Sequence, residues 1–166
     1  MDFEEFKRRV VSVFRKKEEI PFSFSDEVME LFKKSGYRVD SLQVFDSDSF
    51  KAKVSKVDWV SSSSEKLPRV RRDIVGKRLA GDLVLFVDES MGSNRYSYFE
   101  IYNSKFDVVN TLWLGDFLTD LDNRYYRNIL RTFEDDLPDS FIWKINEEAE
   151  GKKMQLLRHK SVDKQG

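Results

Sequence analysis

The spacing of apolar residues changes from about 3.6 to 2 near Tyr37, and this change most strongly limits the folds open to the chain. Before Tyr37, apolar residues recur at helical intervals. After it, residues 37–50 and 50–61 alternate apolar and polar side chains, as half-buried strands do. Helices followed by a run of strands indicate an α+β domain and not a doubly wound parallel sheet.

Two N-terminal helices are predicted. Residues 2–19 form the first, with Asp2 as its N-cap and Pro21 as its stop. Its apolar stripe consists of Phe3, Phe6, Val10, Val13 and Phe14, and its opposite face is basic. The second helix is expected to begin after Ser25 and to end at Gly36.

The middle of the chain predicts a mainly antiparallel or mixed sheet. Residues 82–88 are almost continuously apolar, which indicates a central strand. Residues 95–102 follow through a connection around Gly92 and are expected to pair with that strand. Residues 106–114 are either a further strand or an extended segment that leads into the next helix.

One long helix is expected over residues 116–136, packed on the sheet and ended by Pro138. Residues 140–145 then read as a short final strand. The sequence therefore predicts a single α+β domain over residues 1–146 and a polar C-terminal tail over residues 147–166.

Composition limits the chemistry. The chain has no cysteine and one histidine, His159, which argues against thiol chemistry, Ser-His-Asp hydrolysis and histidine-rich metal sites. A bound metal would have oxygen ligands, which favours Mg²⁺ or Mn²⁺. No apolar run reaches the roughly 20 residues that span a bilayer, so we expect a soluble cytoplasmic protein with no membrane partner.

Two acids on neighbouring strands are candidate metal ligands. Asp82 opens one strand, and Glu100 lies within the next. If the strand register places both carboxylates on one face, they repel each other unless a cation lies between them. A divalent ion at that point can hold a scissile phosphate and polarise the attacking water.

The segment "GDLVLFVD…YFEIYNSK" resembles the paired-strand signature of the PD-(D/E)xK nucleases. The resemblance implies metal ligation by Asp82 and Glu100, with a helical acid such as Glu5 or Glu18 assisting. In that family a lysine follows two residues after the glutamate. Here Tyr102 occupies that position, and the nearest lysine along the chain is Lys105.

A basic segment precedes the first acid. It supplies six cations, Lys66, Arg69, Arg71, Arg72, Lys77 and Arg78. As a loop or an edge strand, it could contact phosphates, while Tyr98 and Tyr102 stack on bases. The alternative interpretation is that these cations protect an edge strand from unwanted pairing.

Three hypotheses follow. The chain is a metal-dependent nuclease or a degenerate relative of one, a DNA- or RNA-binding domain without catalysis, or a protein-interaction module that forms a homodimer. The sequence favours association with nucleic acid.

Overall fold

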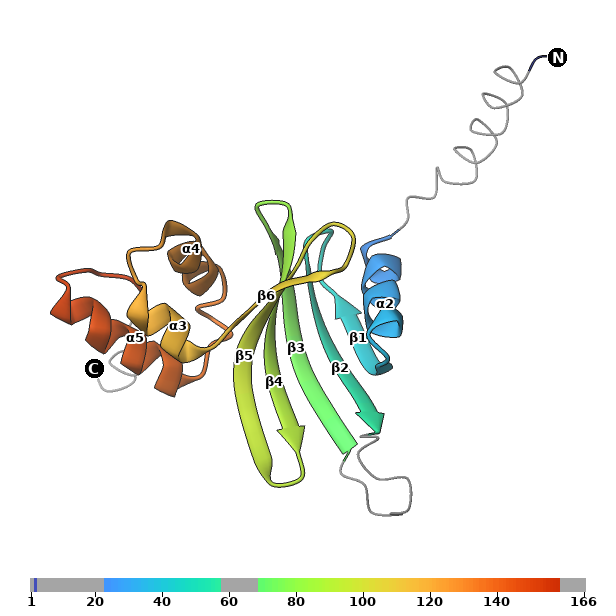
Figure 1. Ribbon diagram of the computed structural model, residues 1–166, viewed down its shortest axis with the longest axis horizontal. Helices are drawn as coiled ribbons and strands as arrows, with labels where there is room; N and C mark the ends of the chain where they lie inside the picture. Colours follow the sequence, from blue (N-terminus) through green and yellow to red (C-terminus); the bar gives the residue numbers. More distant parts are fainter. Residues whose placement is uncertain (1, 3–22, 58–68, 159–166) are drawn as a thin grey trace.

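The computed structural model describes Asp2 and residues 23–57 and 69–158 (Figure 1). The helix expected at residues 2–19 lies outside this part of the chain except for Asp2. The described elements are α2 (Phe24–Lys34), β1 (Arg38–Val44), β2 (Ser49–Val57), β3 (Arg69–Leu79), β4 (Asp82–Met91), β5 (Asn94–Tyr102), β6 (Val108–Leu112), α3 (Leu114–Thr119), α4 (Arg124–Thr132) and α5 (Asp139–Gly151).

Helix α2 begins at a capping box. The hydroxyl of Ser23 accepts a hydrogen bond from the backbone N–H of Asp26 at 3.2 Å, and the Asp26 carboxylate accepts one from the N–H of Ser23 at 3.3 Å. The N-cap is therefore Ser23 and not Ser25. The buried side of the helix consists of Phe24, Val28, Leu31 and Phe32, which pack on the sheet.

Six strands of the described chain form one antiparallel sheet in the order β1-β2-β3-β4-β5-β6, which confirms the α+β prediction. The prediction that residues 82–88 are central is confirmed, and β4 pairs with β5 across the turn at Gly92. The basic segment was expected to be a loop or an edge strand, which is wrong. Its described part forms β3, which hydrogen-bonds to β2 on one side and β4 on the other.

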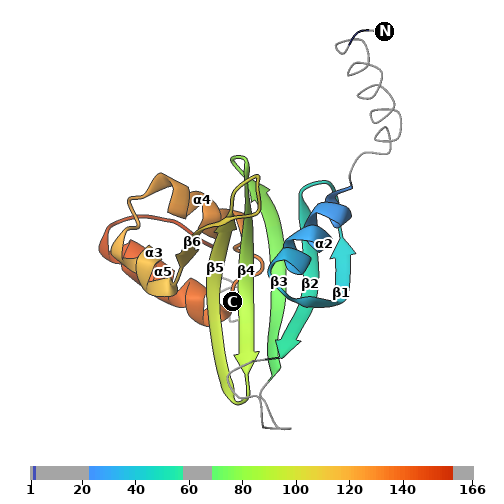
Figure 2. The ribbon, with the colours of Figure 1, turned by 45° about the vertical axis from the view of Figure 1, so that its right-hand side comes forward.

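The two faces of the sheet bury different cores. On the α2 face, helix α2 covers mainly β1–β3, and the cluster includes Phe50, Val54, Ile74, Leu85 and Val87. On the opposite face, which we call the C-terminal helix face, α3, α4 and α5 cover mainly β4–β6. That cluster includes Val84, Phe86, Phe99, Phe117, Ile129, Phe133 and Ile145. Figures 1 and 2 show these helices gathered at one end of the sheet and α2 at the other.

The helices after β6 differ from the prediction. The long helix expected at 116–136 is two helices, because the side chain of Asn123 caps the N–H groups of Tyr125 and Tyr126 and starts α4. The final strand expected at 140–145 is wrong. These residues belong to α5, whose buried positions Phe141, Ile142, Ile145 and Ala149 have helical spacing.

Helix α5 continues past position 146, where the tail was expected to begin. Leu156 and Leu157, further along, are buried against the core of the C-terminal helices. In the segments 23–57 and 69–158, no helix is both long and apolar enough to cross a membrane.

Gly76 on β3 lies directly beneath the ring of Phe50, so a Cβ atom at this position would overlap ring carbons. We expect Gly76→Ala to lower the free energy of unfolding by about 1–3 kcal/mol, the usual cost of overpacking a core, measured by urea denaturation. Gly115→Ala is the control, because no atom lies within 4 Å of a Cβ built there. Equal stability of Gly76→Ala and the wild type would contradict the steric argument.

Candidate functional site

The two acids expected to share a metal lie on opposite faces of the sheet. The β4–β5 register pairs Leu85 with Glu100, which directs the Glu100 side chain toward the α2 face. Asp82 is an odd number of positions from Leu85, so its side chain lies on the C-terminal helix face. There its Oδ2 accepts a hydrogen bond from the Tyr125 hydroxyl at 3.1 Å. The predicted juxtaposition of Asp82 and Glu100 is therefore wrong.

Glu100 is 8 % exposed and is bound by Arg72. The guanidinium of Arg72 donates from Nη1 to Glu100 Oε1 at 2.9 Å and from Nε to Glu89 Oε1 at 2.8 Å. The hydroxyls of Tyr98 and Tyr102 donate to Glu89 and Glu100 at 3.0 and 3.2 Å. One buried cation thus joins two carboxylates, and two phenols complete the network.

The electrostatics of this network keep the Arg72 guanidinium charged. Burial is the largest single influence and disfavours its charge, but the combined effects of Glu100, Tyr98, Tyr37 and Glu89 outweigh burial and raise the pKa of Arg72 above its usual range. Burial also raises the pKa values of Tyr98 and Tyr102, so both phenols stay protonated. Within the described residues, no three His, Cys, Asp or Glu side chains are grouped so as to hold a metal ion.

The remaining residues implied by the nuclease resemblance do not complete a site. Lys105 lies exposed in the β5–β6 turn, where its N–H donates to the Asn103 side chain and its carbonyl accepts from Lys34. Glu5 and Glu18 lie outside the described residues. In the described part of the chain, the element order also lacks the last strand on which the resemblance depended.

The cations of the basic segment do not form one surface in the structure. Lys66 lies outside the described residues. Lys77 donates to the Thr132 carbonyl and pairs with Asp136 at 2.9 Å, so it joins the sheet to the C-terminal helices. Arg78 pairs with Glu27 of α2. With Arg72 in the core, only Arg69 and Arg71 of the predicted cations remain exposed on one surface.

The prediction that Tyr98 and Tyr102 stack on bases is also wrong. Tyr98 and Tyr102 are 5 % and 4 % exposed, and they lie on the α2 face. Arg71 lies on the other face, because it is adjacent in sequence to Arg72 and strand side chains alternate. Bases bound beside Arg71 therefore cannot stack on these two rings.

An arginine–serine row crosses the sheet beside Arg71. Cross-strand partners in register form it, and in strand order they are Arg38, Ser55, Arg71, Ser90 and Arg95. Strands lie about 4.8 Å apart, so the backbones of successive arginines in the row lie roughly 10 Å apart. The row lies on the C-terminal helix face, in the part that α3–α5 leave uncovered. We call this uncovered part the open face.

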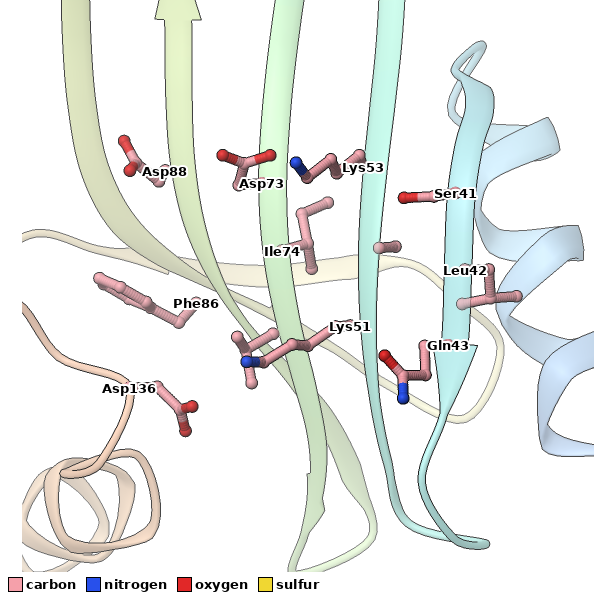
Figure 3. A pocket seen from close by; sticks show the side chains of 12 residues that line it. Ser41, Leu42, Gln43, Lys51, Lys53, Asp73, Ile74, Phe86, Asp88 and Asp136 are labelled. Carbon is pink, nitrogen blue, oxygen red and sulfur yellow. The ribbon is translucent and has the colours of Figure 1, made fainter.

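Two adjoining hollows of about 430 and 460 Å³ shape the open face. Figure 3 shows the first, with Lys51 and Lys53 on β2 and the acids Asp73 and Asp88 on β3 and β4. Four residues of the arginine–serine row line the second hollow, namely Arg38, Arg71, Ser90 and Arg95. Besides Arg72, whose charged end is in the core, the cations of this hollow are Arg38, Lys53, Arg69, Arg71 and Arg95, and its acids are Asp40, Asp73 and Asp88. Five cations against three acids leave an excess of two positive charges, although the whole chain has a net charge of −1.

Of the three arginines in the row, two form ion pairs with acids of the open face. Arg38 pairs with Asp40 at 2.9 Å, and Arg95 pairs with Asp88 at 3.3 Å. A hydrogen bond from Ser55, followed by one from Arg38, lowers the pKa of Asp40, which stays ionised. Among the described residues, Arg71 forms no ion pair. Its guanidinium is therefore the most available anion-binding group of the row.

Local sequence patterns did not indicate Arg38, Lys51, Lys53 or Arg95 as site residues. One signal was present, because Lys51 and Lys53 are two residues apart on a strand and must share a face. Arg38 and Arg95 join them only through the register of five strands, which local spacing does not encode.

Comparisons with protein-family models, with curated proteins and with solved structures find no match. The resemblance to the PD-(D/E)xK nucleases therefore has no support from a relative, and any functional conclusion depends on the geometry of the open face.

Arg71 and Arg72 form a matched pair of adjacent residues on opposite faces. We expect Arg72→Met to lower the free energy of unfolding by about 3–5 kcal/mol, because it leaves Glu89 and Glu100 unpaired in the interior. Arg71→Met should change it by less than about 0.5 kcal/mol, as exposed substitutions usually do. Urea denaturation measures both, and similar losses in the two variants would contradict the assignment of faces.

Three of the six tyrosines should ionise late. Burial, then a hydrogen bond to Asp82, raises the pKa of Tyr125 from 10.0 to about 12. Since the folded-state pKa is raised, folding favours the protonated Tyr125 phenol. The stability that this phenol contributes is complete below pH 10 and is lost as the pH rises through 12. Tyr98 and Tyr102 should behave likewise at higher pH. We expect near-ultraviolet phenolate absorbance to show these three phenols ionising only above pH 10; their ionisation at or below pH 10 would refute this.

Proposed function

We propose that this domain binds nucleic acid through phosphate contacts on the open face and does not cleave it. The observation that carries the proposal is the arginine–serine row, in which three arginines from three strands share one exposed surface. Arginine suits this task because its planar guanidinium donates two parallel hydrogen bonds to a phosphate.

Arg71 is the centre of the proposed contact. It lies in the middle of the row, on the central strand β3, and has no ion-pair partner among the described residues. Ser90, its cross-strand neighbour, adds a hydroxyl that can donate to a phosphate oxygen. Lys53 lines the same hollow and extends the positive surface toward β2.

The acids of the open face limit the strength of binding. Asp73 and Asp88 are direct cross-strand partners, so their carboxylates repel an approaching phosphate and each other. The surplus of two cations favours moderate, salt-sensitive affinity, in the range of about 10⁻⁴–10⁻⁶ M that is typical of non-specific complexes. Phosphates should contact the arginine row and avoid the acidic pair.

The open face favours recognition of the backbone over recognition of the bases. Phe86 is the one aromatic residue lining the two hollows among the described residues, and it is only 6 % exposed. Without exposed rings, base stacking contributes little, so we expect weak dependence on sequence. The separation of Asp82 from Glu100 supports binding without cleavage, since two-carboxylate metal catalysis needs both at one point.

Fluorescence anisotropy with labelled single-stranded and duplex oligonucleotides of mixed sequence tests the proposal. We expect Arg71→Gln to weaken binding about tenfold and to reduce the slope of log K against log[salt] by about one, as the loss of one phosphate contact predicts. Lys144→Gln removes the same charge from an exposed position on α5 and should leave both quantities unchanged. Equal effects of the two substitutions would refute the open face as the binding surface.

The same samples test catalysis. Incubation with Mg²⁺ or Mn²⁺ should leave the labelled strands intact, with EDTA as the matched control. Metal-dependent cleavage that disappears in Asp82→Asn and in Glu100→Gln, with folding intact by circular dichroism, would replace the binding proposal by the nuclease hypothesis.

A further inference from the structure

The two edges of the sheet differ in how they are protected from pairing. The β1 edge carries Arg38 and Asp40, and α2 lies beside it (Figures 1 and 2). Charges and covering elements are the usual means by which proteins blunt an edge strand. Among the described residues, β6 carries no charge, and the helices beside it cover one of its faces, where Leu112 is buried. Its sequence, "VVNTL", contains no charged residue in a chain that is 36 % charged, and β5 is its only strand neighbour in the described sheet.

Strand β6 also presents large apolar side chains to solvent. Val108 and Val109 are 54 % and 60 % exposed, and Val109 is the extra residue of a β-bulge between Val108 and Asn110. Trp113, directly after the strand, is 46 % exposed. Its ring lies 4.7 Å from that of Tyr98 and 6.4 Å from that of Tyr96, which is 43 % exposed. An apolar surface thus extends from the edge onto the α2 face.

We propose that β6 is the interface of a homodimer, in which it pairs antiparallel with β6 of a second copy about a two-fold axis at Asn110. Antiparallel pairing of identical strands makes every contact twice and brings no like charges together within "VVNTL". The two sheets become one of twelve strands. Val109 of each copy lies opposite Thr111 of the other, and the two Trp113 rings flank the seam.

The charges next to the strand favour a second copy over an unrelated strand. Antiparallel pairing about Asn110 brings the β5–β6 turn of one copy to the end of β6 in the other, where α3 begins. Lys105 in that turn is thereby placed on the same side as the first turn of the partner copy's α3, which carries Asp116. Both residues are exposed in the monomer, and the pair forms twice. This gives Lys105 a role that does not depend on Asp82 or Glu100.

Sedimentation velocity of the 166-residue chain without nucleic acid tests the proposal, with each variant first shown to be folded by circular dichroism. At micromolar concentrations the wild type should sediment as a dimer of the 19.7 kDa chain. Val109→Lys and Val109→Asp should each raise the dimer dissociation constant at least tenfold, because either sign of charge is then brought to the seam twice.

Phe45→Lys is the matched control, since it adds the same charge at a side chain that is 51 % exposed, directly after β1. It should leave the dimer intact. Lys105→Glu should weaken the dimer about fivefold or more, because it places an acid beside Asp116. A monomeric wild type, a dimer indifferent to Val109→Lys, or one indifferent to Lys105→Glu would each overturn the proposed interface, whatever the outcome for nucleic acid.

Discussion

The buried guanidinium of Arg72 is the interaction on which the rest of this structure depends. It joins β3 to carboxylates on β4 and β5, and therefore ties together three neighbouring strands. The two carboxylates would repel each other in the interior without it, and the phenols of Tyr98 and Tyr102 complete the hydrogen bonding. Glu100, which has the sequence position of a metal ligand, is thus part of an ion pair that holds the sheet together.

This ion pair also fixes what the opposite face presents. With Arg72 directed into the α2 face, Arg71 and Asp73 on either side of it must point to the open face. The residues that stabilise the sheet and those proposed to bind phosphate consequently alternate along one strand. A sequence rich in arginine gives no sign of this division until the strand and its face are known. The proposed β6 interface lies at the edge far from β1–β3, so binding of nucleic acid and dimerisation use separate surfaces.

Local sequence patterns accounted for much of the architecture but little of the site. Alternating apolar residues located β1 and β2, a nearly continuous apolar run located β4, and the connection around Gly92 placed β5 beside it. Helical spacing located α2, because burial of one side of an element leaves a period that can be read directly. The pattern failed at residues 140–145, where a short apolar run fits either a strand or a helix. It also failed for β3, whose many charges suggested an edge or a loop. The partners of Asp82 and Glu100 depend on register, and the arginine–serine row depends on four registers at once.

The contact between Gly76 and Phe50 limits how this protein can change during evolution. The ring of Phe50 occupies the space in which any side chain at position 76 would lie, and the β2–β3 register places the two residues opposite each other. An insertion or deletion of one residue between Arg72 and Gly76 would present Val75 or Lys77 to that ring and would exchange the faces of the arginines beyond it. We therefore expect homologous sequences to vary in length within the connections around this strand and to keep the separation between Arg72 and Gly76 constant.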